Sequence, residues 1–249
     1  MAHESKLRRA AARVLTGLIV LLMAAVAGLA WAYPSVAATT CPSCYGLTEQ
    51  SPGLYVEADL PPARRAEISR IVDEASERVT DFYGGRRSSP TVLACTTEEC
   101  YQRIGGGKER GIAVLNRAVM LSPRGLDPVI ASHEMSHVEL HQRLASGVQV
   151  PQWFDEGLAV VLSDDRRYLA PATTAESTTE AAGTASDDRC LVPPDGPLPA
   201  TLDDWLRAAG KDPRTYAKAA CQASRWLNAN GGRTGLLTAI DRLNSGRTL

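Results

Sequence analysis

Histidine is scarce in this chain, whose 249 residues include only four. Three of the four, His133, His137 and His141, nevertheless lie within the single segment "SHEMSHVELHQ" (132–142). Because so much of a rare residue is concentrated in one place, this segment is the first candidate for a functional site.

A large excess of charge of either sign is also absent. Lys and Arg total 27, Asp and Glu total 28, and the formal net charge is −1. Nucleic-acid-binding domains carry a strongly basic surface, so we expect no nucleic-acid partner. Internal repeats are absent as well, and the length fits one substantial domain or two small ones.

Charge is missing altogether from Val14 to Ala32, where Thr16 is the only polar side chain. The preceding residues 1–13 are basic, which predicts a cytoplasmic n-region followed by an apolar export segment. The run 14–32 has the length of a transmembrane signal anchor, which needs about 17–25 residues. A cleaved signal peptide usually has an apolar core of about 7–15 residues, so the length favours an anchor.

A cleaved signal peptide remains the alternative, because "AWA" (30–32) and "VAA" (36–38) are both acceptable cleavage sites. In either case everything after Pro34 is exported. We therefore expect a single-pass membrane protein with an extracytoplasmic domain, or a secreted or periplasmic protein if the signal is removed. Residues 33–50 would be a tether and residues 51–249 the folded domain.

Export changes the interpretation of the six cysteines, because an even number in an oxidising compartment indicates disulfides. The expected pairs are Cys41–Cys44, Cys95–Cys100 and Cys190–Cys221. Two weaker alternatives stay open. The segment "CPSC" (41–44) has the spacing of a thioredoxin-type redox motif, and the first four cysteines could form a zinc knuckle.

Hydrophobic periodicity and turn residues divide the exported part into strands followed by helices, which is the order of an α+β fold. The expected strands are 54–60, 90–95 and 111–123, the last as one or two strands. The expected helices begin near residues 62, 128, 151, 201, 213 and 234. The Thr-, Ala- and Ser-rich segment 171–187 is expected to be a mobile surface loop.

His133 and His137 lie on the helix that Asp127 and Pro128 are expected to begin. Side chains four residues apart share one face of a helix, so both imidazoles can bind the same metal ion. Glu134 would stand beside that metal, where its carboxylate can take a proton from metal-bound water. This is the H-E-x-x-H pattern of two ligands and a general base. Taken alone it is short enough to arise by chance, as two solvated histidines on a surface helix.

A catalytic zinc ion needs a third protein ligand and an open fourth position. Glu156, in "WFDEGLA", follows His137 by nineteen residues and lies on the next expected helix. The motif at 133–137 together with Glu156 resembles the gluzincin metallopeptidases, in particular the peptidase MA-like and aminopeptidase N-like families. Their third ligand is a Glu in a Trp-x-(Asn/Asp)-Glu-Gly-x-Ala context. The resemblance implies one Zn²⁺ per chain, with His133, His137 and Glu156 as ligands and Glu134 as general base.

The same resemblance implies a zincin-like fold, with a small mixed sheet packed on the metal-binding helix and a helical C-terminal part. The family's edge strand would correspond to "GIAVLNRAVML" (111–121) and could hold an extended peptide by strand addition. The Gly-x-Met-Glu-Asn type segment with which aminopeptidases bind a free N-terminus is absent. We therefore expect an endopeptidase that acts on a peptide or protein substrate.

Tyr216 is the candidate hydrogen-bond donor to the oxyanion, because "YAKA" (216–219) resembles the Tyr-x-Lys-Gly/Ala segment of aminopeptidase N-like enzymes. Alternatively Tyr216 packs its helix on the core, and Tyr168 and His141 are rival donors. Around the helix His141 lies about 80° from His133, so we expect it behind the ligands or at the surface. Asp155 could orient a ligating imidazole or be solvated.

Four apolar residues near Glu156 are expected to pack the core rather than bind substrate, namely Trp153, Phe154, Leu158 and Val161. The sequence thus predicts an exported, membrane-tethered zinc metallopeptidase. The main alternative is a zinc-binding pseudoprotease or scaffold that binds a partner without cleaving it. A thiol–disulfide protein that uses "CPSC" has less support.

Overall fold

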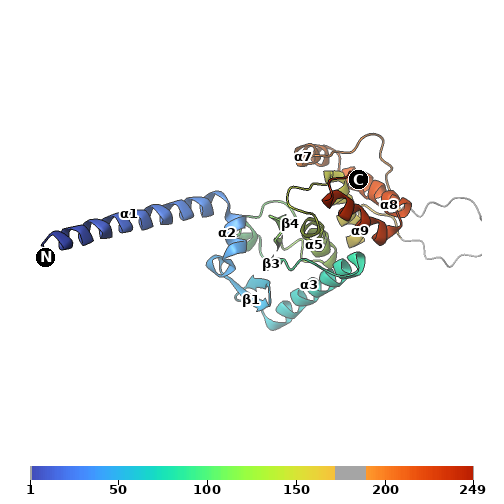
Figure 1. Cartoon of the computed structure of the whole chain (residues 1–249). Helices are drawn as coiled ribbons and strands as arrows, with labels where there is room; N and C mark the ends of the chain where they lie inside the picture. The colour runs from blue at the N-terminus through green and yellow to red at the C-terminus, as the bar shows by residue number, and fades with distance from the viewer. Residues whose placement is uncertain (1, 172–188, 249) are drawn as a thin grey trace, which may run out of the picture.

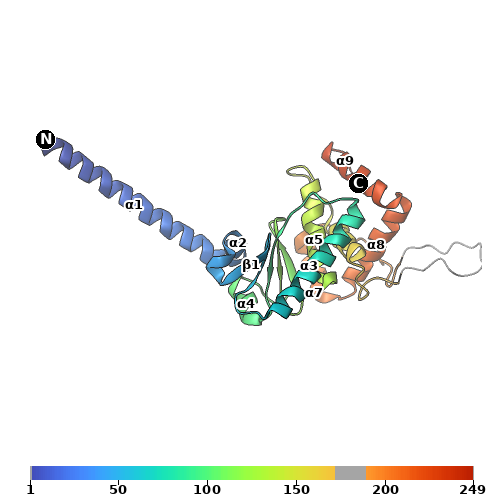
Figure 2. The same cartoon turned by 90° about the horizontal axis from the view of Figure 1, so that it is seen from below.

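The computed structural model describes residues 2–171 and 189–248. Apart from Pro171, the segment expected to be a mobile loop lies outside these residues. The described chain is an α+β structure, in which a small mixed sheet and its covering helices are followed by helices (Figures 1 and 2). The helices are α1 (Ala2–Ala32), α2 (Pro34–Thr40), α3 (Pro62–Tyr83), α4 (Glu98–Arg103), α5 (Pro128–Arg143), α6 (Gln152–Ser163), α7 (Leu202–Lys211), α8 (Thr215–Ala229) and α9 (Gly232–Asn244), with a 3-10 turn η1 (Pro42–Tyr45).

The sheet has five strands in the order β1-β2-β3-β5-β4 among the described residues. The strands are β1 (Leu47–Ser51), β2 (Leu54–Glu57), β3 (Thr91–Ala94), β4 (Gly111–Val114) and β5 (Ala118–Leu121). The central strands β2, β3 and β5 run parallel, while β1 and β4 are antiparallel edge strands. The expected strand 111–123 is therefore two strands, with a turn between them.

Both faces of the sheet are buried, which explains why its central strands are apolar at successive positions. On one face, Val92 and Val119 pack with α3 and α5 in the main core. On the other face, Leu93 and Met120 pack with Ala38 of α2 and with side chains of α4. The sheet is thus a layer between two helical coverings.

Helix α5 begins where the sequence predicts. Asp127 is its N-cap, accepting a hydrogen bond from the Val129 amide at 2.7 Å, and Pro128 is its first residue. The helix lies against β4 and β5 and also packs on α3 and α6. The histidine segment is therefore held between the sheet edge and the following helix.

Helix α6 packs closely on α8, and Gly157 is the residue that permits this. A Cβ at Gly157 would collide with the Ala219 carbonyl of α8 and with the Ala223 side chain. The glycine of "DEGLA" therefore lets the helix that carries Glu156 lie directly against the helix that carries Tyr216.

Helix α1 projects away from the rest of the chain (Figures 1 and 2). Its window Leu15–Ala32 is long and apolar enough to cross a membrane, and its side chains are not buried against the protein. A helix of this kind near the N-terminus fits either a signal sequence or a single span.

The segment 33–50 is folded onto the sheet, which differs from the expected tether. It forms α2, η1 and most of β1, and β1 pairs with β2. Ala38 and Leu47 are buried, and a Cβ at Gly105 would collide with the start of α2. The folded part of the chain therefore begins immediately after α1.

Three disulfides are formed, and they are the expected pairs Cys41–Cys44, Cys95–Cys100 and Cys190–Cys221. No cysteine of the chain is free. Since a zinc knuckle needs thiolates, this pairing argues against the four-cysteine alternative.

Candidate metal site

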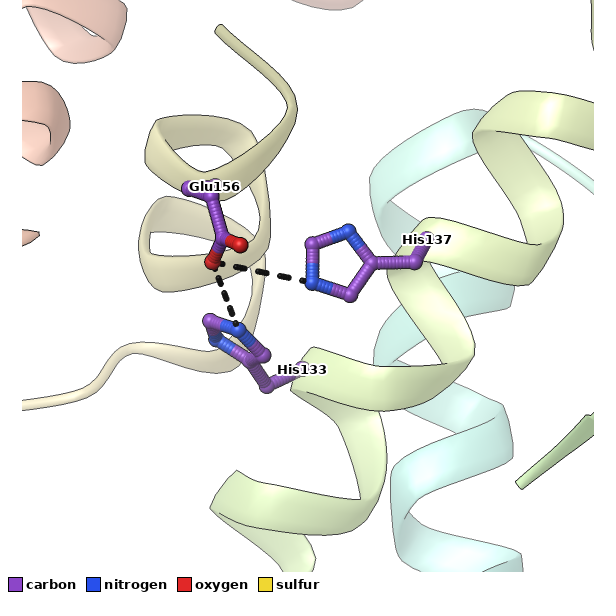
Figure 3. A group of neighbouring side chains, drawn as sticks. All are labelled: His133, His137 and Glu156. Carbon is purple, nitrogen blue, oxygen red and sulfur yellow. Dashed lines mark ion pairs between the residues drawn. The ribbon is translucent and has the colours of Figure 1, made fainter. Parts of the chain in front are cut away.

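Two helices bring three potential metal ligands together (Figure 3). Helix α5 supplies His133 and His137 from successive turns, and α6 supplies Glu156. The Oε2 atom of Glu156 lies 3.4 Å from Nε2 of His133 and 3.8 Å from Nε2 of His137. One ligand atom from each residue lies within 4.8 Å of the other two. These three side chains could hold one metal ion.

Glu156 has one oxygen available to a ligand. Its Oε1 accepts a hydrogen bond from Nε2 of Gln152 at 3.2 Å. Its buried Oε2 has no hydrogen-bond partner in the described structure. Its contacts with the two imidazole nitrogens, at 3.4 and 3.8 Å, are ion pairs rather than hydrogen bonds. A cation between the oxygen and the two imidazoles would give all three ligand atoms a closer partner. Two imidazole nitrogens and one carboxylate oxygen are a ligand set that zinc accepts, so the residues fit this metal.

Asp155 fixes the orientation of His137. Its Oδ1 lies 2.6 Å from Nδ1 of His137, and its Oδ2 lies 2.8 Å from Nε2 of His141. Because Nδ1 of His137 is engaged, Nε2 is the nitrogen left to face Glu156. A carboxylate that holds a ligating imidazole in this way is common around metals. The sequence left open whether Asp155 is solvated; its side chain is 8% exposed and bonded to two histidines.

Burial and the attraction between Asp155 and His137 shift the pKa values of these two groups in opposite directions, and the attraction has the larger effect. Burial raises the pKa of Asp155, but the charge and hydrogen bond of His137, together with His141, hold it far below its usual range. Burial lowers the pKa of His137, but Asp155, Glu156 and Glu134 raise it to about 10. Without a metal, His137 is therefore protonated at neutral pH.

Glu134 lies beside the edge strand β4 rather than among the three ligands. Its carboxylate accepts a hydrogen bond from the Ala113 amide. A Cβ at Gly111 would come within 2.8 Å of Cγ of Glu134, so the glycine leaves room for this side chain. Burial raises the pKa of Glu134, and the nearby histidines reduce this rise without cancelling it. A carboxylate with a raised pKa beside potential ligands suits a general base.

Tyr216 lies beside the potential ligands on α8. Its ring centroid is 6.4 Å from that of His133. The ring stacks on Tyr168 at 5.1 Å and meets the edge of Trp205 at 5.0 Å. Burial and the carboxylates of the site raise the pKa of Tyr216, against the effect of a hydrogen bond from Trp205. Its hydroxyl therefore keeps its proton and can donate it to a hydrogen bond.

A cleft of about 500 Å³ opens beside the site. Its walls include Glu134, His137 and His141 of α5, Ala113 of β4 and Asp155 of α6. A volume of this size can admit part of a peptide. The cleft therefore reaches His137 and Glu134.

Comparisons with protein-family models, curated proteins and solved structures found no match. The site is accordingly assigned from its own geometry. Phe154 and Leu158 are buried in the main core, and Trp153 and Val161 pack partly buried against it, as expected. The contact of Asp155 with His137 is one of the two alternatives that the sequence left open. The further contact of Asp155 with His141 was not predicted, because it depends on how α5 and α6 cross.

Proposed function

We propose that this chain is an exported zinc metallopeptidase with a zincin-like fold, in which His133, His137 and Glu156 bind one zinc ion. The observation that carries the proposal is the buried Oε2 of Glu156, which has no hydrogen-bond partner among the described residues and faces Nε2 of both His133 and His137. Structural zinc sites have four protein ligands, whereas catalytic sites have three and an open position. Three potential ligands among the described residues, next to a cleft, therefore favour catalysis.

Zinc bound at such a site polarises a carbonyl group and lowers the pKa of bound water to about 7. Glu134 would accept a proton from the attacking water and deliver it to the leaving amine. Asp155 would keep Nε2 of His137 directed at the metal. Tyr216 would donate a hydrogen bond to the carbonyl oxygen as negative charge develops there.

The proposed substrate is a peptide or protein cleaved internally. Strand β4 is at the edge of the sheet and its Ala113 amide contacts Glu134, so a peptide added along β4 would lie over the catalytic residues. Three disulfides and the apolar helix α1 support an extracytoplasmic location, either anchored by α1 or released by its removal.

The test is digestion of a peptide library by the zinc-loaded full-length chain, read by mass spectrometry. Cleavage should stop with a chelator and return with zinc. Glu134→Gln should keep its zinc and its fold but lose nearly all turnover, because the base is gone. Glu98→Gln, which changes an exposed carboxylate on α4, is the matched control and should cleave normally.

Two outcomes would contradict the proposal in different ways. Loss of zinc from Glu134→Gln would place Glu134 among the ligands. A zinc-loaded wild-type chain that cleaves no peptide would leave a zinc-binding scaffold instead of an enzyme.

A further inference from the structure

The cleft beside the metal site has a second wall, built outside the helices that carry the potential ligands. Val150 precedes α6, Ala200 precedes α7, and Leu202 is the first residue of α7; all three line the cleft. None of them has a side chain that could bind a metal or transfer a proton. We call these three residues the aliphatic wall. They offer apolar contact, while Gln149 and Thr201 of the same two segments add hydrogen-bonding groups to the lining.

Leu202 is fixed in position although 55% of it is exposed. Before it, the Ala200 carbonyl accepts a hydrogen bond from the Gln152 amide at 3.0 Å, which ties the chain to the start of α6. After it, Trp205 is 1% exposed and packs on Tyr216. Leu202 is held between these two anchors, so its exposure towards the cleft is built into the fold.

The aliphatic wall of the cleft offers no charged partner to a substrate side chain. None of the described residues that line the cleft is Lys or Arg. The cleft's two carboxylates belong to the metal site itself, since Asp155 is bonded to two histidines and Glu134 is the proposed base. A charged group placed against Leu202 would lose water beside an apolar side chain, whereas an aliphatic group there would bury apolar surface.

We propose that the aliphatic wall forms a specificity pocket, in which Leu202 selects an uncharged aliphatic side chain of the substrate close to the scissile bond. The inference rests on the proposed function, because it assigns the pocket to a peptide. It adds a substrate class to that function, namely peptides with a residue such as Leu at the position that meets α7.

The test measures binding rather than turnover. Acetylated, amidated heptapeptides with one central Leu, Asp or Lys among six alanines are titrated into zinc-loaded, full-length Glu134→Gln protein. The Leu peptide should bind about tenfold or more tightly than the others, since single methylene groups in apolar pockets already discriminate by about 10–200-fold. Adding Leu202→Lys should reverse the order, so that the Asp peptide binds most tightly.

Leu206→Lys is the matched control. Leu206 lies one turn further along α7, is 61% exposed and is not among the residues that line the cleft. It adds the same charge to the same helix and should leave the Leu peptide preferred. The proposal of a specificity pocket is refuted by any of three results. Leu202→Lys could leave the order of peptide affinities unchanged, Leu206→Lys could reverse that order equally, or no peptide could bind. A Leu202-dependent preference without cleavage by the wild type would uphold the pocket and refute the peptidase.

Discussion

In two of the potential ligands, His137 and Glu156, one polar atom is hydrogen-bonded and the other remains available to a metal ion. His137 gives Nδ1 to Asp155 and keeps Nε2, and Glu156 gives Oε1 to Gln152 and keeps Oε2. Glu134 is bonded to the edge strand and not to the potential ligands. The atoms left over are those that a metal ion, a water molecule and a substrate would need.

The raised pKa of His137 predicts how zinc affinity depends on pH. Below about pH 10 the metal-free protein carries a proton on His137, and zinc must displace it. The apparent zinc affinity should therefore rise by about tenfold per pH unit between pH 7 and 8.5, measured by competition with a chromophoric chelator. Asp155→Asn should flatten this dependence, since the main group that raises the pKa is gone. A flat profile in the wild type would contradict the assignment.

Tyr216→Phe tests the proposed hydrogen-bond donor. The change should leave zinc content nearly unchanged, because the ring keeps its contacts with Tyr168 and Trp205. It should reduce the free energy of unfolding by about 1–3 kcal/mol, since the buried Trp205 loses the acceptor of its hydrogen bond. It should lower kcat by about 10²–10³, or roughly 2.7–4 kcal/mol of transition-state stabilisation. Tyr168→Phe is the control and should stay within a few-fold of wild type. If instead Tyr168→Phe shows the large loss, the donor is Tyr168.

The three potential ligands could be predicted from the sequence because each depends on a local rule. The spacing of His133 and His137 follows from helix geometry, and Glu156 lies in a segment that resembles a known one. The bridge from Asp155 to His141 follows no such rule. It requires α5 and α6 to cross at the point that brings Asp155 next to His141, and only tertiary packing determines where helices cross.

At the level of secondary structure elements, α5 is joined to the loop after α3 by a buried charged group. Glu139 of α5 is fully buried and accepts hydrogen bonds from the Arg87 and Ser88 amides and from Arg143. Arg143 in turn donates to the Gly85 carbonyl at 2.6 Å. This group fixes the C-terminal half of the helix that carries the histidines.

Glu139→Gln should therefore destabilise the fold strongly. The variant leaves Arg143 buried without a counter-charge, which costs about 3–5 kcal/mol in free energy of unfolding. Glu74→Gln is the control, because its pair with Arg78 is partly exposed and worth about 0.3–0.5 kcal/mol. Chemical denaturation of both variants measures the difference. Equal losses would show that the buried pair does not stabilise α5.

Element boundaries were predictable where caps and periodicity agree, as at Asp127 and Pro128. They were not predictable for α2 and β1. The segment "LTEQS" (47–51) has one large apolar residue, Leu47, because an edge strand buries little. Its identity as a strand comes from pairing with β2, a contact that sequence periodicity does not report.

At the scale of the whole molecule, α1 is followed directly by the folded part of the chain, with only Tyr33 between α1 and α2. Ala38 of α2 is fully buried in the core on the second face of the sheet. Helix α2 is thus part of the fold, whether α1 stays as an anchor or is removed.

The mature chain should therefore either keep α1 or begin at Tyr33, and it should retain α2 in both cases. Cleavage after Ala38 would remove a buried residue and most of a helix that covers the sheet, which folding disfavours. The intact mass of the protein, measured on material from membranes and from the medium, identifies the N-terminal residue in each case. A folded, zinc-binding chain that begins at Thr39 would contradict this account.

Elemental analysis of the purified full-length chain tests the claim that His133, His137 and Glu156 make a zinc site. The wild type should contain one zinc ion per chain. His137→Ala and Glu156→Ala should each lose most of it, while His3→Ala, which removes the one histidine outside the segment 132–142, should retain it. Full zinc content in His137→Ala, or no zinc in a wild-type chain exposed to the metal, would contradict the claim.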